Sequence, residues 1–132
     1  MPTNTNVVID TNVIISGFIN TVGKPGKIVN MVISQDSRMQ ICYNTQILEE
    51  YENVLTRPHF NFVEEKWRKF LDNVKKHGTF CDPPPSTIPL PDETDRCFYD
   101  VAKFCKATLI TGNTKHYPSE DFILSPADFL GD

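Results

Sequence analysis

The sequence lacks a metal-binding pattern of cysteines. Cys42, Cys81, Cys97 and Cys105 include no C-x-x-C pair and have no histidine at ligand spacing, so structural zinc is not expected. We expect Cys97 and Cys105 to act as small buried hydrophobic side chains on one side of a helix. A disulfide is compatible with the spacing, but the chain does not need one in order to fold.

A long hydrophobic run is also missing. The longest apolar stretch without a charge, residues 13–22, is interrupted by serine, glycine, asparagine and threonine, which makes it too short and too polar to span a bilayer. Residues 1–6 lack the basic region that opens a secretory signal peptide. We therefore expect no membrane span and a cytoplasmic location.

The chain has no excess of positive charge. Its net charge of -4 argues against a protein that grips nucleic acid through a broad basic surface. Nucleic acid remains open as a substrate, because an acidic site that recruits a divalent cation can hold phosphate through the metal. Hydrophobic residues make up 39% of the 132 residues, enough for a core, and the length predicts one domain over residues 1–132.

Short apolar runs alternate with helical patterns along the chain. Strands are expected at residues 7–9, 40–43, 79–81, 108–110 and 122–124. The first expected helix is capped by Thr11 or Asn12 and ends at Phe18. Further helices are expected at residues 27–34, 45–57 and 63–76. The last two begin at Asp92 or Thr94, ending at residue 106, and at residue 125. The alternation predicts an α/β three-layer sandwich with a mostly parallel central sheet and helices on both faces.

Polar residues stand where the expected strands end, and in parallel sheets the ligand crevice lies beyond those ends. Asp10 closes the first strand, and Asn113 follows the strand at residues 108–110. Asp95 lies at the start of the helix that leads into that strand, and Glu50 lies on the helix after the second strand. Several anions placed together repel one another or bind a cation, and hard divalent ions prefer oxygen ligands. Mg²⁺ or Mn²⁺ is the expected occupant.

Each of these residues also has a purely structural interpretation. Asp10 could cap the following helix, and Glu50 could face solvent on an acidic helix. Asp95 and its neighbour Asp92 suit a helix N-terminus, and Asn113 after glycine is an ordinary turn residue. Only the combination of residues supports a metal-site hypothesis.

Four sequence blocks resemble those of a known family. They read V-V-I-D-T-N-V-I-I-S-G-F from residue 7, I-L-E-E-Y-E-N-V-L-T-R-P-H-F from 47, D-E-T-D-R-C-F-Y-D-V-A from 92 and L-I-T-G-N-T-K-H-Y-P from 109. In this order they resemble the PIN-domain family, and within it the VapC-like toxins of bacterial toxin–antitoxin systems. The resemblance implies a 5'-nuclease-like fold whose acidic quartet binds one or two Mg²⁺ or Mn²⁺ ions.

The resemblance also implies roles for individual residues. Asp10 matches the first acid, Glu50 the second with Glu49 as the alternative register, and Asp95 the third, so that Asp10, Glu50 and Asp95 would be the metal ligands. Asn113 stands at the fourth catalytic position, where the family often has aspartate.

An amide oxygen can bind a metal or orient a water, but it adds no negative charge. Asp92 or Asp100 would then compensate for the missing acid. Lys115 and His116 are candidate phosphate contacts at the mouth of the site.

The implied function is endoribonuclease activity, in which a metal-activated water cleaves RNA and leaves 5'-phosphate products. The implied partners are an RNA substrate, a cognate antitoxin protein and a second copy of the chain in a homodimer. The alternative is a catalytically degenerate PIN domain that acts as a protein- or RNA-binding module. A phosphatase of the haloacid dehalogenase type is disfavoured, because Asn12 stands where that family needs an aspartate.

Overall fold

The computed structural model describes residues 5–131 and contains one central sheet. Its strands are β1 (Thr5–Ile9), β2 (Met39–Tyr43), β3 (Thr79–Phe80), β4 (Thr108–Ile110) and β5 (Ile123–Leu124). Their order is β3-β2-β1-β4-β5, and every neighbouring pair is parallel. Most of the N-terminal segment used above to argue against a secretory leader lies outside the described residues.

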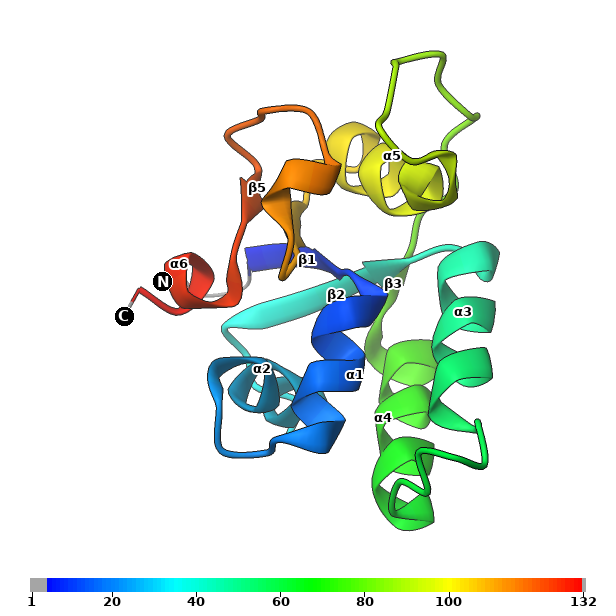
Figure 1. Ribbon diagram of the computed structural model, residues 1–132, viewed down its shortest axis with the longest axis vertical. Helices are drawn as coiled ribbons and strands as arrows, with labels where there is room; N and C mark the ends of the chain where they lie inside the picture. The colour runs from blue at the N-terminus through cyan, green and yellow to red at the C-terminus, as the bar shows by residue number, and fades with distance from the viewer. Residues whose placement is uncertain (1–4, 132) are drawn as a thin grey trace.

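Helices cover both faces of the sheet (Figure 1). They are α1 (Thr11–Ile19), α2 (Lys24–Ile33), α3 (Thr45–Leu55), α4 (Glu64–His77), α5 (Arg96–Phe104) and α6 (Pro126–Leu130), with short 3₁₀ turns η1 (Glu93–Asp95) and η2 (Thr114–His116). Helix α5 packs against β1 and β4, while α2 and α4 pack against β2. This arrangement confirms the predicted α/β class with a parallel central sheet.

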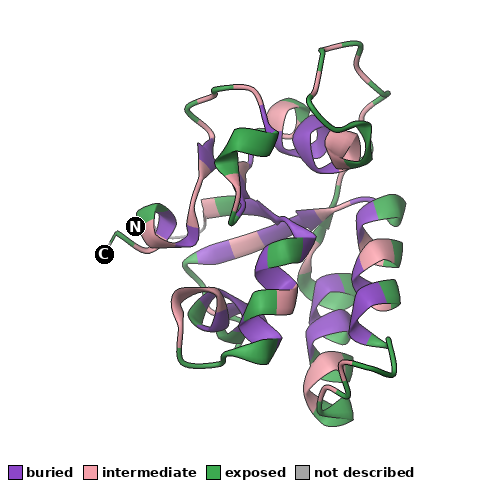
Figure 2. Cartoon of the chain, in the orientation of Figure 1, coloured by how far each residue is buried: buried purple, intermediate pink, exposed green. Residues whose placement is uncertain are grey.

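The core lies on both sides of β1, the central strand. Val7, Val8 and Ile9 have no exposed surface, as expected for a parallel strand covered on both faces. Figure 2 shows the buried residues along the strands and on the helix faces turned toward the sheet. A strand held this firmly gives a fixed position to the residue that follows it, Asp10.

The predicted strand and helix boundaries mostly agree with the structure to within about two residues, but α2 differs. It begins at Lys24, whereas we expected a turn there and a helix from residue 27. Pro25 lies in the first turn of α2, where its missing N–H leaves no hydrogen bond unmade. Helix α3 starts as predicted, because the Asn44 side chain accepts a hydrogen bond from the Ile47 N–H at 2.9 Å.

The expectation for Cys105 was wrong. Cys81 and Cys105 form a disulfide with their Cα atoms 6.3 Å apart, joining the residue after β3 to the end of α5. Cys97 is a free, half-buried thiol, and Cys42 is free and buried. The pairing depends on where the end of α5 lies relative to β3, which spacing alone does not indicate.

Within residues 5–131, no helix is long and apolar enough to cross a membrane. The longest of them, α4, has 14 residues, whereas a spanning helix needs about 20.

Candidate active site

The pairing of β1 with β4 fixes the position of Asp10. Ile9 lies opposite Ile110 in the parallel register, and the Asp10 N–H donates to the Ile110 carbonyl at 2.9 Å. The residues that follow these two strands, Asp10 and Thr111, are therefore side by side. Both are buried, Asp10 with 7% of its surface exposed and Thr111 with none.

Two hydroxyl groups hold the Asp10 carboxylate. Its Oδ2 atom accepts hydrogen bonds from Thr111 Oγ1 at 2.9 Å and from Tyr117 Oη at 2.8 Å. Asp10 occupies the N-cap position of α1, yet its side chain makes no capping hydrogen bond. Capping is therefore not the role of this carboxylate.

Tyr117 and Thr111 were not among the predicted site residues. Both lie in the sequence block from residue 109, and Thr111 directly follows a strand, which is the signal that could have identified it. Burial is the first cause of a raised pKa at Tyr117, and the charge of Asp10 is the second. Tyr117 therefore stays protonated and remains a donor to Asp10.

Of the two candidate glutamates, Glu50 is the one directed toward Asp10. Its Oε1 atom accepts a hydrogen bond from the hydroxyl of Thr11, the residue next to Asp10, at 3.0 Å. The Tyr51 hydroxyl donates to the Ile9 carbonyl and ties α3 to the end of β1. Glu49 is exposed and lines a separate hollow on the surface of α3.

Asp95 lies at the junction of η1 and α5, half-buried and close to other acids. Burial raises its pKa to about 6, and the negative charges of Asp10, Asp92 and Glu50 add to the rise, while His116 opposes it. The carboxylates predicted to converge from three distant segments therefore do influence one another. Burial is the larger cause of the raised pKa at Asp95, and repulsion from the neighbouring acids adds to it.

Removing the charge of Asp95 should stabilise the metal-free protein. Because its pKa is raised, Asp95 keeps a proton in the folded state between about pH 3.8 and 6, where the unfolded state has released it. The charged Asp95 carboxylate therefore destabilises the folded state fully above this pH window and not at all below it. We expect Asp95→Asn to raise the free energy of unfolding by about 1 kcal/mol at pH 7, since solvent screens part of the repulsion. The gain should shrink toward zero near pH 4.

Thermal unfolding of Asp95→Asn and the parent protein in EDTA, at pH 7 and at pH 4, checks this prediction. Equal midpoints at pH 7, or a gain that grows on acidification, would contradict it.

Asn113 is positioned by the same loop. Its N–H donates to Thr111 Oγ1 at 3.1 Å, and its amide nitrogen lies 3.0 Å from His116 Nε2. Hydrogen bonds from Thr94 lower the pKa of Asp92, and the exposed His116 adds to this lowering and works against the rise at Asp95. The neutral fourth position is thus paired with a histidine.

Asp100, one of the two acids expected to compensate for Asn113, is engaged by the proline-rich segment. It is 3% exposed, and its two oxygens accept hydrogen bonds from Ser86 N at 2.9 Å and Ser86 Oγ at 2.6 Å. Arg96 donates to the Ser86 and Ile88 carbonyls nearby. Asp100 therefore anchors the proline-rich segment.

Comparison with known proteins identifies the family. The chain matches the PIN domain family over residues 6–115. It belongs to that family. The uncharacterized protein MJ1680 of Methanocaldococcus jannaschii is 31% identical over 117 residues, which cover 81% of this chain and 70% of that protein. No solved structure matches the chain. PIN domains are generally nucleases, so this one has a nuclease-type fold.

PIN nucleases typically use divalent metals, and the donor set of this PIN domain suits such an ion. Among residues 5–131 no three acidic, histidine or cysteine side chains form a ready-made metal cage. Mg²⁺, however, keeps several waters and binds through few carboxylates. Asp10, Glu50 and Asp95 offer oxygen donors only, and negative charge from Asp10, Asp92 and Glu50 adds to the effect of burial at Asp95.

A groove of about 660 Å³ extends the PIN-domain site on the side of Glu50. It runs between the start of α3, residues 83–85 and the start of α5, and its acidic lining residues are Glu50, Asp82, Glu93 and Asp100. Because these acids repel phosphate, the groove does not by itself attract a polyanion.

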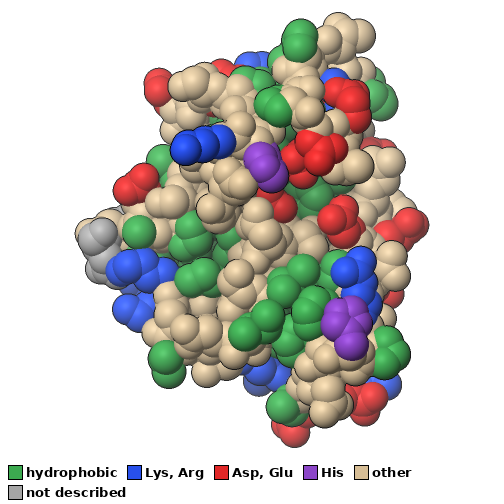
Figure 3. Space-filling model, in the orientation of Figure 1, with side chains coloured by type: hydrophobic (Ala, Val, Ile, Leu, Met, Phe, Trp, Pro, Cys, Tyr) green, Lys and Arg blue, Asp and Glu red, His purple; other side chains and the backbone are tan. Residues whose placement is uncertain are grey.

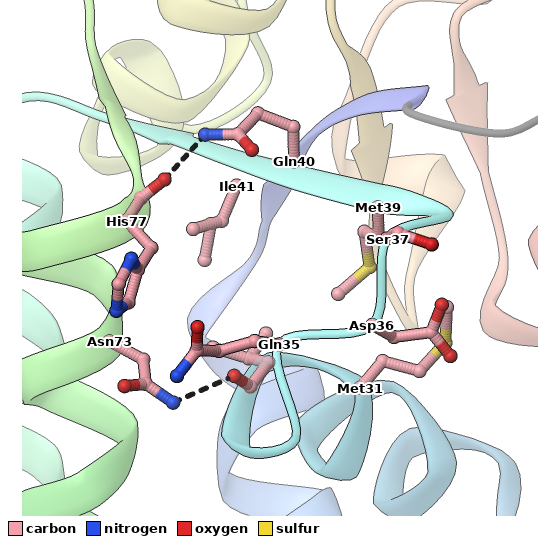
Figure 4. A pocket seen from close by; sticks show the side chains of 10 residues that line it. Met31, Gln35, Asp36, Ser37, Met39, Gln40, Ile41, Asn73 and His77 are labelled. Atoms are coloured by element: carbon pink, nitrogen blue, oxygen red, sulfur yellow. Dashed lines mark hydrogen bonds between the residues drawn. The ribbon is translucent and has the colours of Figure 1, made fainter.

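A second cavity lies near the start of β2, at the end of the strands opposite to the acidic site (Figure 4). It has a volume of about 500 Å³. Gln40 donates to the His77 carbonyl, and Asn73 donates to the backbone carbonyls at the end of α2. These contacts tie β2, α4 and α2 together, and the cavity takes no part in the acidic site.

Proposed function

We propose that this PIN domain is a metal-dependent endoribonuclease. The observation that supports it most strongly is the setting of Asp10, a buried carboxylate at the end of the central strand, oriented by Thr111 and Tyr117. The charges of Asp10 and Glu50 both act on Asp95. Membership of the PIN domain family supports the same reaction class.

Asp10, Glu50 and Asp95 would hold a Mg²⁺ or Mn²⁺ ion in this proposal. Such an ion supplies a water of lowered pKa and stabilises negative charge on the leaving oxygen of a phosphodiester. The remaining chemistry belongs to the side chains of the chain itself.

The hydroxyl groups of the site keep its carboxylates in one orientation. Thr111 and Tyr117 both donate to Oδ2 of Asp10, so that Oδ1 would be the oxygen available to a metal ion. Thr11 holds Glu50 in the same way through Oε1. Preorganised ligands of this kind avoid the cost of reorientation when substrate binds.

Asp95 and Asn113 would orient the attacking water. The amide nitrogen of Asn113 is occupied by His116, so its amide oxygen is the atom that can accept a hydrogen bond from water. Lys115 and His116 are exposed beside the site and would contact the phosphate backbone, Lys115 with a positive charge that the acidic groove does not supply.

The finer biological role is part of this proposal and is supported by the four sequence blocks alone. As the toxin of a toxin–antitoxin pair, the protein would act in the cytoplasm as a homodimer and be inhibited by an antitoxin protein that covers the acidic crevice. A neighbouring small protein that copurifies and suppresses RNA cleavage would support this role. Harmless overexpression of an active nuclease would count against it.

The second candidate is a catalytically degenerate domain that binds protein or RNA. It is favoured by one observation, the neutral Asn113 at the fourth position, which adds no negative charge to the site.

Cleavage of a labelled single-stranded RNA separates the two candidates. The nuclease proposal expects products with 5'-phosphate ends in Mn²⁺ or Mg²⁺ and none in EDTA. Glu50→Gln should lower the rate, whereas Glu49→Gln, the adjacent exposed glutamate, should not. RNA binding without cleavage in either metal would favour the degenerate domain.

A further inference from the structure

A patch of exposed hydrophobic side chains lies on the same face of the molecule as the acidic site. Ile19, Val22 and Val63 are 65%, 83% and 68% exposed. Figure 3 shows hydrophobic side chains gathered over α1, with acidic side chains above them on that face. Single exposed apolar residues are common, but a contiguous group marks a binding surface.

The patch surrounds a hollow of about 370 Å³ between the end of α1 and the loop that joins α3 to α4. Its lining residues are Phe18, Ile19, Thr21, Phe60, Asn61, Phe62, Val63 and Lys66.

Aromatic rings form one wall of this hollow. The Phe60 and Phe62 rings are stacked with centroids 4.9 Å apart and an interplanar angle of 9°. His59 lies against Phe60 at 4.4 Å, and Phe62 contacts Phe18 at 5.4 Å. The series therefore runs from an exposed histidine to the buried Phe18.

We propose that this hollow binds a base of single-stranded RNA. The inference rests on the proposed nuclease function and adds a substrate-binding site to it. Aromatic side chains at a protein surface are the usual platforms on which unpaired bases stack, and the half-buried Phe60 and Phe62 rings stand in such a series at this hollow, with the exposed His59 ring against Phe60.

The charge and polarity of the hollow fit a nucleotide. Lys66 is its one charged lining residue, with Nζ 5.1 Å from the Phe18 ring centroid, and it can reach a phosphate beside a stacked base. Asn61 offers an amide to the edge of a base. The groove beside Glu50, lined by several acids, lacks this complementarity.

The distance from the acidic site suits a single strand. Asp10 precedes α1 and Phe18 lies in its last turn, so eight residues at 1.5 Å per residue separate them by about 12 Å. At roughly 3.4 Å per stacked nucleotide, this distance corresponds to three or four nucleotides. A base held here would keep the strand on the protein while a phosphodiester lies at the acidic site.

Binding of a labelled ten-nucleotide RNA in EDTA, followed by fluorescence anisotropy, tests the proposal without cleavage. Stacking on aromatic side chains predicts that Phe60→Ala and Phe60→Leu each weaken binding by about tenfold or more. Phe60→Leu keeps apolar bulk, so its loss would not reflect misfolding. The matched control is Phe80→Ala, because Phe80 is 55% exposed on β3 and outside the hollow.

Two further measurements sharpen the test. An abasic ten-nucleotide RNA should bind the wild-type protein weakly. Its affinity should be similar to that of the intact RNA for the Phe60→Ala variant. Lys66→Gln should reduce by about one the slope of log affinity against log salt concentration.

Each outcome separates this proposal from the nuclease proposal. If the wild type cleaves RNA and both Phe60 variants bind RNA with unchanged affinity, the base site alone is overturned. The same holds if the wild type cleaves RNA but binds none in EDTA. A wild type that neither binds nor cleaves RNA would overturn both. If Phe60→Ala instead converts a dimer to a monomer on gel filtration with RNA affinity unchanged, the patch is a contact between two copies.

Discussion

Replacing Asp10 by asparagine should abolish metal-dependent RNA cleavage while leaving the fold intact. An asparagine oxygen can still accept the hydrogen bonds from Thr111 and Tyr117, so the loop after β4 keeps its place. The negative charge that would attract the ion is lost. Removing a group that supports a metal ligand costs 10- to 100-fold in many sites, so we expect the loss of a ligand itself to exceed about 100-fold in rate.

A graded series of variants makes this result specific. Tyr117→Phe removes one hydrogen bond to Asp10 and keeps the carboxylate, so we expect a smaller loss of about 10- to 100-fold. Asp72→Asn removes an exposed charge on α4 and should leave the rate unchanged. Initial rates with labelled RNA in Mn²⁺ give all three values. An Asp10→Asn protein as active as the wild type would end the assignment of Asp10.

Reducing the Cys81–Cys105 disulfide should destabilise the protein by about 3 kcal/mol. The bridge spans 24 residues of sequence, and a closed loop of this size restricts the unfolded chain by roughly that free energy. For a domain of this length the corresponding drop in melting temperature is about 10 °C. The bridge also closes the chain on both sides of the proline-rich segment that walls the groove beside Glu50.

Thermal unfolding with and without dithiothreitol measures this effect. Cys81→Ser with Cys105→Ser should melt at the lower temperature in both conditions, because Cys42 and Cys97 are free thiols in the structure. Four titratable thiols in the unfolded, unreduced protein would refute the disulfide.

The fold could be predicted from the sequence because its signals are local. The run Val7–Ile9 is β-branched and ends abruptly at a polar residue, and a buried parallel strand requires both features. The boundary of α2 could not be predicted in the same way. Pro25 indicates a turn when read alone and a first helical turn when the helix is present.

The candidate site was predictable at its centre and less so at its edges. Asp10 follows from strand position, but Tyr117 reaches it from a loop whose path obeys no periodic pattern. Glu50 and Glu49 are adjacent, and the choice between them depends on the rotation of α3, which the bond from Tyr51 to Ile9 fixes. Asp100 lies five residues after Asp95, and at 3.6 residues per turn this places it about 140° around the helix.

The repulsion around Asp95 connects these observations. A folded protein tolerates a carboxylate of raised pKa beside Asp10 and Glu50 only if the rest of the fold holds it there, and such arrangements are concentrated at functional sites. A bound cation would remove the repulsion and stabilise the fold at the same time.

Calorimetric titration of Mn²⁺ into the purified protein at pH 7 tests the central claim most directly. The account predicts saturable binding to the wild type and its loss in Asp10→Asn, with folding of both proteins verified by circular dichroism. The absence of binding to the wild type, or equal binding to both proteins, would contradict it.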